Sequence, residues 1–182
     1  MNKRQNTLGV KVIAYTAVLT ALSSLSNIFS LILGGGALNV SFAYIPAFIA
    51  GAFINPLAGF LTGILGDLIG CIIAPKGALN PIILISSGLL GLIPGMVFWI
   101  AKKRNIDTQK YSSALTTISF LLVFMICIPL NTIGLFLFYF KAKGKTLAAV
   151  FVMRYSKQSI ILAANFILTI IIQKPLIKLI KV

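Results

Sequence analysis

The chain has 182 residues, of which 59% are hydrophobic and 10% charged, and its mean hydropathy of +1.04 lies far outside the range of soluble domains. The net charge is +14, but most basic residues flank apolar runs, which is typical of membrane topology signals and not of a nucleic-acid-binding surface. There is no His, and Cys71 and Cys127 both lie in apolar runs, so neither a metal site nor a disulfide framework is expected. We therefore predict an all-α integral membrane protein in which residues 1–182 form a single transmembrane domain.

Apolar runs along the chain predict six transmembrane helices. Their predicted bounds are residues 12–33, 40–54, 57–74, 81–101, 113–140 and 147–172. The first run follows Asn2-Lys3-Arg4, as the apolar part of a signal peptide would. It is too long for such a segment and is not followed by a small-residue cleavage motif, so we interpret it as a retained membrane anchor.

The distribution of basic residues predicts the orientation. With six spans, one face of the membrane carries Lys3, Arg4, Lys11, Lys102, Lys103, Arg104, Lys110, Lys174, Lys178 and Lys181. The other face carries Lys76, Lys141, Lys143 and Lys145. The excess on the first face places both termini in the cytoplasm. The four outer lysines either concentrate an anionic solute near the protein or are ordinary interfacial residues.

Small residues recur at close-packing spacing in three spans. The third span has a stripe at Gly59, Gly63, Gly66 and Gly70, and the fourth repeats the pattern at Gly91 and Gly95. Such stripes allow helix backbones to touch. Asp67 follows Gly63 by four residues, so we expect it to face protein and not lipid. An acid at membrane depth indicates a functional site, with a structural hydrogen-bonding role as the alternative.

The first span contains an AxxxA pattern formed by Ala17 and Ala21. Alanines at this spacing are common in membrane helices. The pattern is compatible with packing inside the protein or with contact to a partner helix.

The stretch from Pro129 to Lys157 places polar and charged residues inside apolar runs. Asn131 and Thr132 lie in the fifth span, and Arg154 and Lys157 lie three residues apart in the sixth. A cation at bilayer depth costs at least ~2.5–3.5 kcal/mol unless it faces a partner or a wet cavity. Asp67 is the only acid in a span, since Asp107 lies in a polar loop. We therefore predict a positively charged pocket that receives an anion from outside.

An enzymatic activity is not expected. Gly144-Lys145-Thr146 resembles the end of a phosphate-binding loop, but the first glycine of that motif is replaced by Tyr139. Without His and with only two acids, the chain also lacks a nucleophile–base pair. ATP hydrolysis by this chain is therefore excluded.

Taken together, these features resemble the substrate-binding S component of energy-coupling factor (ECF) vitamin transporters, and most closely the folate-specific S component. The residues that carry the resemblance are Ala17 and Ala21, Ile45-Pro46, Ala50-Gly51, Pro56-Leu57-Ala58-Gly59, the run from Gly63 to Gly70, Pro75-Lys76-Gly77-Ala78, Leu130-Asn131-Thr132, Tyr139 with Lys141, and Arg154 with Lys157. The likeness extends from about residue 17 to residue 175. The sequence departs from it at Asn27, where an arginine is expected, and at Asn80-Pro81, where a Pro-Gly pair is expected.

The resemblance implies a function and a set of sites. The chain would bind folate at its extracellular end and deliver it by toppling in the membrane while docked on a transmembrane coupling subunit, which two ATPase subunits drive. It would need no cofactor, because the partner subunits use the ATP. The implied folate-binding residues are Asp67, Pro75, Gly77, Asn131, Thr132, Tyr139, Arg154 and Lys157, and the implied docking residues are Ala17 and Ala21. The implied location is the bacterial plasma membrane, as a multi-pass protein.

Other functions stay open at this stage. The chain could be an S component for another vitamin, or a small secondary carrier or channel for an organic anion. A carrier usually shows internal repeats and broken helices, and the two halves of this sequence have no convincing repeat. A structural membrane adaptor would have no use for Arg154 and Lys157 at membrane depth.

Overall fold

A computed structural model of the chain describes residues 3–29, 31–33, 38–75, 79–141, 144 and 146–179. Along the chain the elements are α1 (Lys3–Ile28), β1 (Leu31–Leu33), β2 (Leu38–Val40), α2 (Tyr44–Ile49), the π-helix η1 (Ala50–Ile54), α3 (Pro56–Ile73), α4 (Pro81–Lys103), α5 (Ser112–Leu135), the π-helix η2 (Phe136–Phe140) and α6 (Leu147–Leu179). The fold is thus helical, as predicted, apart from one short hairpin. Several residues of the sequence motifs and of the resemblance lie outside the described residues, among them Gly34 to Gly36, Lys76, Gly77, Lys143 and Lys145.

The predicted end of the first span is wrong. Helix α1 ends at Ile28, and Leu31–Leu33 leaves the helix to pair antiparallel with Leu38–Val40, with Leu31 opposite Val40 and Leu33 opposite Leu38. A short apolar run fits a strand as well as a helix, so hydrophobicity alone does not place this boundary. The three glycines at 34–36 disfavour continuation of the helix through this stretch.

The second predicted span is much shorter than a membrane crossing. Helix begins only at Tyr44, and α2 with η1 ends at Ile54. Five other helices are long and apolar enough to cross a membrane: Gly9–Ile28, Pro56–Ile73, Pro81–Lys103, Ser112–Phe140 and Leu147–Pro175. The described residues therefore contain five candidate spans and one short apolar helix, and the last span runs past the predicted end at residue 172.

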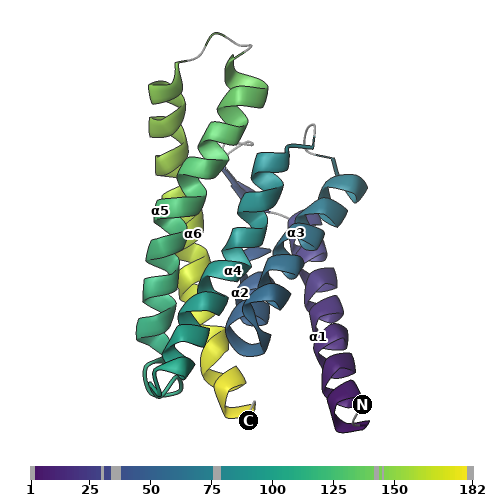
Figure 1. Cartoon of the computed structure of the whole chain (residues 1–182). Coiled ribbons are helices and arrows are strands. Elements are labelled where there is room, and N and C mark those ends of the chain that lie inside the picture. Colours follow the sequence, from purple (N-terminus) through teal and green to yellow (C-terminus); the bar gives the residue numbers. More distant parts are fainter. Residues whose placement is uncertain are drawn as a thin grey trace.

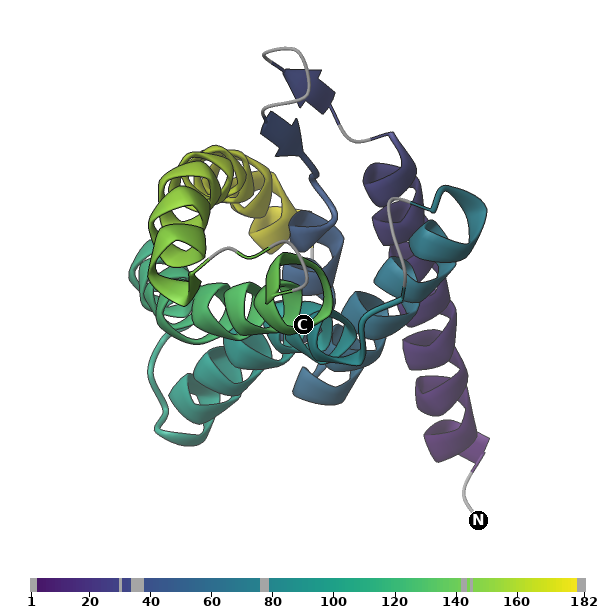
Figure 2. The ribbon, with the colours of Figure 1, turned by 90° about the horizontal axis from the view of Figure 1, so that it is seen from above.

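The helices form an open bundle with α2, α3 and α4 at its centre. Helices α5 and α6 lie side by side on one flank, and α1 lies on the other flank against α3 (Figure 1 and Figure 2). The hairpin lies between α1 and α6 when the molecule is seen from above (Figure 2). The start of α1, the end of α6 and the α4–α5 connection are at one end of the molecule (Figure 1).

Glycines explain the close crossing of α3 on its two neighbours. A methyl group at Gly63 would overlap the carbonyl of Ser87, and one at Gly59 would overlap that of Gly91, both on α4. On the other side of α3, a methyl group at Gly66 or Gly70 would meet side chains of α1. The predicted packing role of the stripe is confirmed, and its two halves serve different partners.

Asparagine caps begin the two central helices. The side chain of Asn55 accepts a hydrogen bond from the Ala58 amide at 2.6 Å, and Asn80 accepts one from Ile82 at 3.0 Å. In each case proline follows at the first helical position, where its missing amide costs nothing. The Asn80-Pro81 pair therefore defines the start of α4.

Candidate functional site

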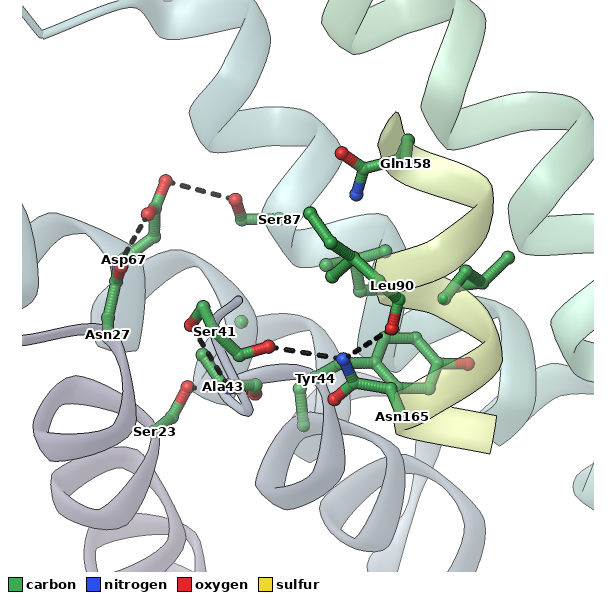
Figure 3. A pocket seen from close by; sticks show the side chains of 14 residues that line it. Ser23, Asn27, Ser41, Ala43, Tyr44, Asp67, Ser87, Leu90, Gln158 and Asn165 are labelled. Carbon is green, nitrogen blue, oxygen red and sulfur yellow. Dashed lines mark hydrogen bonds between the residues drawn. The ribbon is translucent and has the colours of Figure 1, made fainter. Parts of the chain in front are cut away.

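A cavity of about 190 Å³ lies between α1, α3, α4, α6 and the segment that joins β2 to α2 (Figure 3). Its polar lining residues come from six parts of the chain. They are Ser23 and Asn27 of α1, Ser41 of the joining segment, Tyr44 of α2, Asp67 of α3, Ser87 of α4, and Gln158 and Asn165 of α6. Polar groups from so many elements converge in one place, which is the usual form of a small-molecule site.

Asp67 is the charged member of this lining and links three helices. One carboxylate oxygen accepts from the Asn27 amide at 2.8 Å and from the Cys71 thiol at 3.9 Å. The other oxygen accepts from the Ser87 hydroxyl at 2.9 Å (Figure 3). The prediction that Asp67 faces protein is confirmed, and Asn27, which stands where the resemblance expects arginine, is one of its partners.

The Asp67 carboxylate keeps capacity for a ligand. An ionised carboxylate has about four acceptor positions on its two oxygens, and the two strong bonds to Asn27 and Ser87 occupy two of them. No described cation forms an ion pair with Asp67. The site therefore offers negative charge and acceptor positions to a ligand that carries adjacent N–H donors.

Hydrogen bonds fix the segment after the hairpin between α1 and α6. The Asn165 amide donates to the carbonyls of Ser41 at 3.1 Å and Ile161 at 2.9 Å (Figure 3). From the α1 side, the Ser23 hydroxyl donates to the Ala43 carbonyl at 3.2 Å. Asn165 is only 2% exposed, so it acts as an internal brace of one cavity wall.

One face of α6 carries Arg154, Gln158 and Asn165. Their spacings of four and seven residues stack them along the helix, and Gln158 and Asn165 both line the cavity. The Nε of Arg154 is buried and has no hydrogen-bond partner among the described residues. Arg154 does not line the cavity, and with about 1.5 Å of rise per residue it lies ~6 Å along the helix from Gln158.

Lys157 is exposed, and it lies about 60° around the helix from Arg154 and about 100° from Gln158. Neither Lys157 nor Arg154 lines the cavity. The structure therefore does not bring the predicted Arg154–Lys157 pair together with Asp67 in one cavity. It places Arg154 beyond one end of the cavity and Lys157 at the side.

The remaining predicted binding residues lie outside the cavity lining. Thr132 is fully buried and its hydroxyl donates to the Ile128 carbonyl of its own helix at 2.7 Å. Asn131, its neighbour on α5, has a buried side-chain oxygen without a partner among the described residues. Pro75 is exposed just after α3, Tyr139 is half-buried in η2, and Gly77 lies outside the described residues.

The predicted docking residues lie in a second hollow. Ala17 and Ala21 are exposed and line a groove of about 840 Å³ between α1 and α3. The rim is apolar and includes Leu57, Leu61 and Leu65 of α3. This groove is therefore open to a second hydrophobic surface.

Sequence reasoning missed Asn27, Ser87, Gln158 and Asn165 as members of the site. Two signals were available: each is a polar residue within a long apolar run, and Gln158 follows Arg154 by one helical turn. The pairing of Asn27 with Asp67 spans 40 residues, so no local pattern could have revealed it.

Comparisons with known proteins agree with this architecture. A family model described as the ECF-type riboflavin transporter, S component, matches residues 7–182. The folate transporter FolT of Clostridium novyi (strain NT) is 28% identical over 123 residues, which is 68% of this chain and 65% of that protein. The match thus spans just under two thirds of the curated relative.

A solved structure supports the same assignment. The crystal structure of FolT bound with folic acid superposes with a TM-score of 0.68 at 25% sequence identity, over 87% of this chain and 90% of that one. The family model covers almost the whole sequence, and its members are transporter subunits and not enzymes. The chain therefore belongs to the family of S components of ECF-type transporters.

Proposed function

We propose that this chain captures folate at the extracellular side of a bacterial plasma membrane. The proposal rests on the placement of two charged residues. Asp67 lines the polar cavity, and Arg154 lies one helical turn along α6 from Gln158, which lines the opposite wall. A pterin ring presents an amino group and a ring N–H side by side, which one carboxylate accepts together. The glutamyl tail carries two negative charges and suits the Arg154 end.

The names of the relatives support folate over riboflavin for this chain. The family model is named for riboflavin, whereas the curated relative and the solved structure are folate proteins. Riboflavin has no carboxylate, so it would leave Arg154 without a counter-charge. An S component for another vitamin is the alternative, and the Asp67–Arg154 arrangement favours a ligand with ring donors at one end and negative charge at the other.

We further propose that the α1–α3 groove is the surface on which the chain meets a coupling subunit. Ala17 and Ala21 leave room for a helix to approach α1 to backbone contact, and the surrounding leucines supply apolar area. Two ATPase subunits would drive the assembly, and the chain would deliver folate by toppling in the membrane. Both termini would be cytoplasmic, in agreement with the cluster Lys102, Lys103 and Arg104 at the α1-start end of the molecule.

Transport in vesicles tests this function against a carrier or channel. We expect folate uptake only when the coupling and ATPase subunits are co-expressed and ATP is supplied on the side of the vesicle membrane that carries the ATPase subunits. A catalytically inactive ATPase subunit is the matched control. Folate uptake by the chain alone, without ATP, would favour a secondary carrier.

A further inference from the structure

Gln158 is a half-buried polar residue on the cavity face of α6. No described residue forms a hydrogen bond with its amide, whereas the side chains of Asp67, Ser87, Asn27, Ser23 and Ser41 all have partners. The Tyr44 hydroxyl and the Asn165 Oδ1 also lack a partner among the described residues, but both atoms are fully buried. A polar group with free donors at the wall of a cavity is available to a ligand.

The position of Gln158 relates it to the acidic end of the site. In Figure 3 its amide points from α6 toward Ser87, which in turn donates to Asp67. The only O–H of Ser87 is therefore already used in its hydrogen bond to the carboxylate. Gln158 is left as the neighbouring group that can donate to a ligand acceptor.

We propose that Gln158 is a specificity-determining residue that donates a hydrogen bond to the ring carbonyl of the substrate. This inference rests on the proposed folate function. If Asp67 accepts from the amino group and ring N–H of a pterin, the carbonyl beside that N–H needs a donor. The Gln158 amide supplies it, and the three ring groups are then read by two side chains on opposite walls.

The test combines protein variants with a ligand pair. The probes are folic acid and its 4-amino-4-deoxy analogue, in which an amino donor replaces the ring carbonyl acceptor and the adjacent ring nitrogen loses its hydrogen. Because the second change alters the contact with Asp67, each variant is compared with the wild type for the same ligand. The variants are Gln158→Leu, which removes all hydrogen bonding, and Gln158→Glu, which keeps the size but leaves only acceptors at neutral pH. Ser156→Ala, on the exposed side of the same turn, is the matched control. Dissociation constants are measured by calorimetry on the detergent-purified chain, with thermal unfolding as a check of the fold.

We expect Gln158→Leu to weaken folic acid by about tenfold, the usual worth of one hydrogen bond, and Gln158→Glu to weaken it further. The affinity of the analogue should change little in Gln158→Leu. In Gln158→Glu the affinity of the analogue should rise relative to that of folic acid, so that the preference for folic acid shrinks or reverses. A folded variant that weakens both ligands by the same factor would overturn the proposal, because a structural role does not distinguish them. So would a Gln158→Glu variant that binds folic acid as tightly as the wild type. Failure of the wild type to bind folic acid would instead overturn the proposed function itself, and this inference with it.

Discussion

Helix α1 borders two hollows of opposite chemistry. Ser23 and Asn27 line the polar cavity on one side of the helix, and Ala17 and Ala21 line the apolar groove, which runs along another side from Val12 to Ile28. The adjacent residues Ser23 and Ser24 face different hollows, because neighbours on a helix are rotated by about 100°. One pair of helices, α1 and α3, therefore forms part of both surfaces.

The two hollows also differ in how their side chains are held. In the cavity, Asn27, Asp67 and Ser87 are tied to one another across three helices. In the groove, the hydroxyls of Thr16, Thr20 and Ser24 donate to carbonyls one turn earlier on α1 itself, at 2.7–2.9 Å, so they offer little to a polar ligand. A preorganised polar cavity suits a small molecule. An apolar groove whose hydroxyl groups are already hydrogen-bonded within their own helix suits a partner helix. We infer that binding and docking are separable tasks.

The largest effect should come from filling the groove. A bulky side chain in Ala17→Trp would keep a partner helix from reaching α1, so ATP-dependent uptake should be lost. Folate affinity of the isolated chain should hardly change, because Ala17 does not line the cavity. Both quantities are measured on the same variant, by uptake in vesicles and by ligand titration.

Val18→Trp is the control for this substitution. Val18 is exposed and does not line the groove, so a tryptophan there should leave both binding and uptake intact. Loss of binding together with uptake in Ala17→Trp would mean that the alanines serve internal packing, and the separation of the two hollows would be wrong.

Removing the charge of the cavity should have the next largest effect. Asp67→Asn keeps the shape but replaces a carboxylate by an amide, so folate binding should weaken by about 1.5–3 kcal/mol, the worth of a hydrogen bond to a charged group. Calorimetry on the purified chain measures the change. Asp107→Asn is the control, because Asp107 lies in the α4–α5 loop and its carboxylate accepts from the Gln109 and Lys110 backbone amides there. Similar losses in both variants would point to an effect of net charge and not of the cavity.

Arg154→Ala should act on the other end of the ligand. We expect a loss of about 1.5–3 kcal/mol for folate, but almost none for a pterin that lacks the glutamyl tail. The truncated pterin should still respond fully to Asp67→Asn. Equal sensitivity of this pterin to both substitutions would contradict the assignment of the two ends. Lys157→Ala should cost less, within the ~0–1 kcal/mol of an exposed ion pair, because Lys157 is exposed.

The smallest effects should come from the groups that hold Asp67. Asn27→Ala and Ser87→Ala each remove one neutral donor to the carboxylate, and each should weaken folate binding by about 0.5–1.5 kcal/mol. Ser26→Ala is a matched control, since its hydroxyl donates to the Leu22 carbonyl of α1 and Ser26 does not line the cavity. Tighter binding in Asn27→Ala would mean that the amide competes with the ligand and does not position the acid.

The sequence predicted the parts of this architecture that depend on local patterns. The bounds of α3 and α4, the packing role of the α3 glycines and the inward direction of Asp67 all follow from apolar runs, turn residues and four-residue spacing. The hairpin at Leu31–Leu33 was missed because an apolar triplet has no preference that separates strand from helix.

The cavity lining could not be predicted for a different reason. Contacts such as Asn27 with Asp67, or Asn165 with Ser41, join residues 40 and 124 positions apart, and only the packing of the helices brings them together. The spacing of Arg154 and Lys157, three residues apart on α6, predicts that both cations line one pocket. That spacing does place Arg154 and Lys157 on one side of the helix, about 60° apart, but Lys157 is exposed whereas the Arg154 Nε is buried.

Native mass spectrometry of the purified chain with folate, riboflavin and thiamin present together tests the central claim most directly. We predict a single adduct of one folate per chain, which an excess of riboflavin or thiamin does not displace. Among the cavity variants, Asp67→Asn should lose this adduct most readily. An adduct of riboflavin or thiamin in place of folate would contradict the assignment of the cavity to a ligand with ring donors at one end and negative charge at the other.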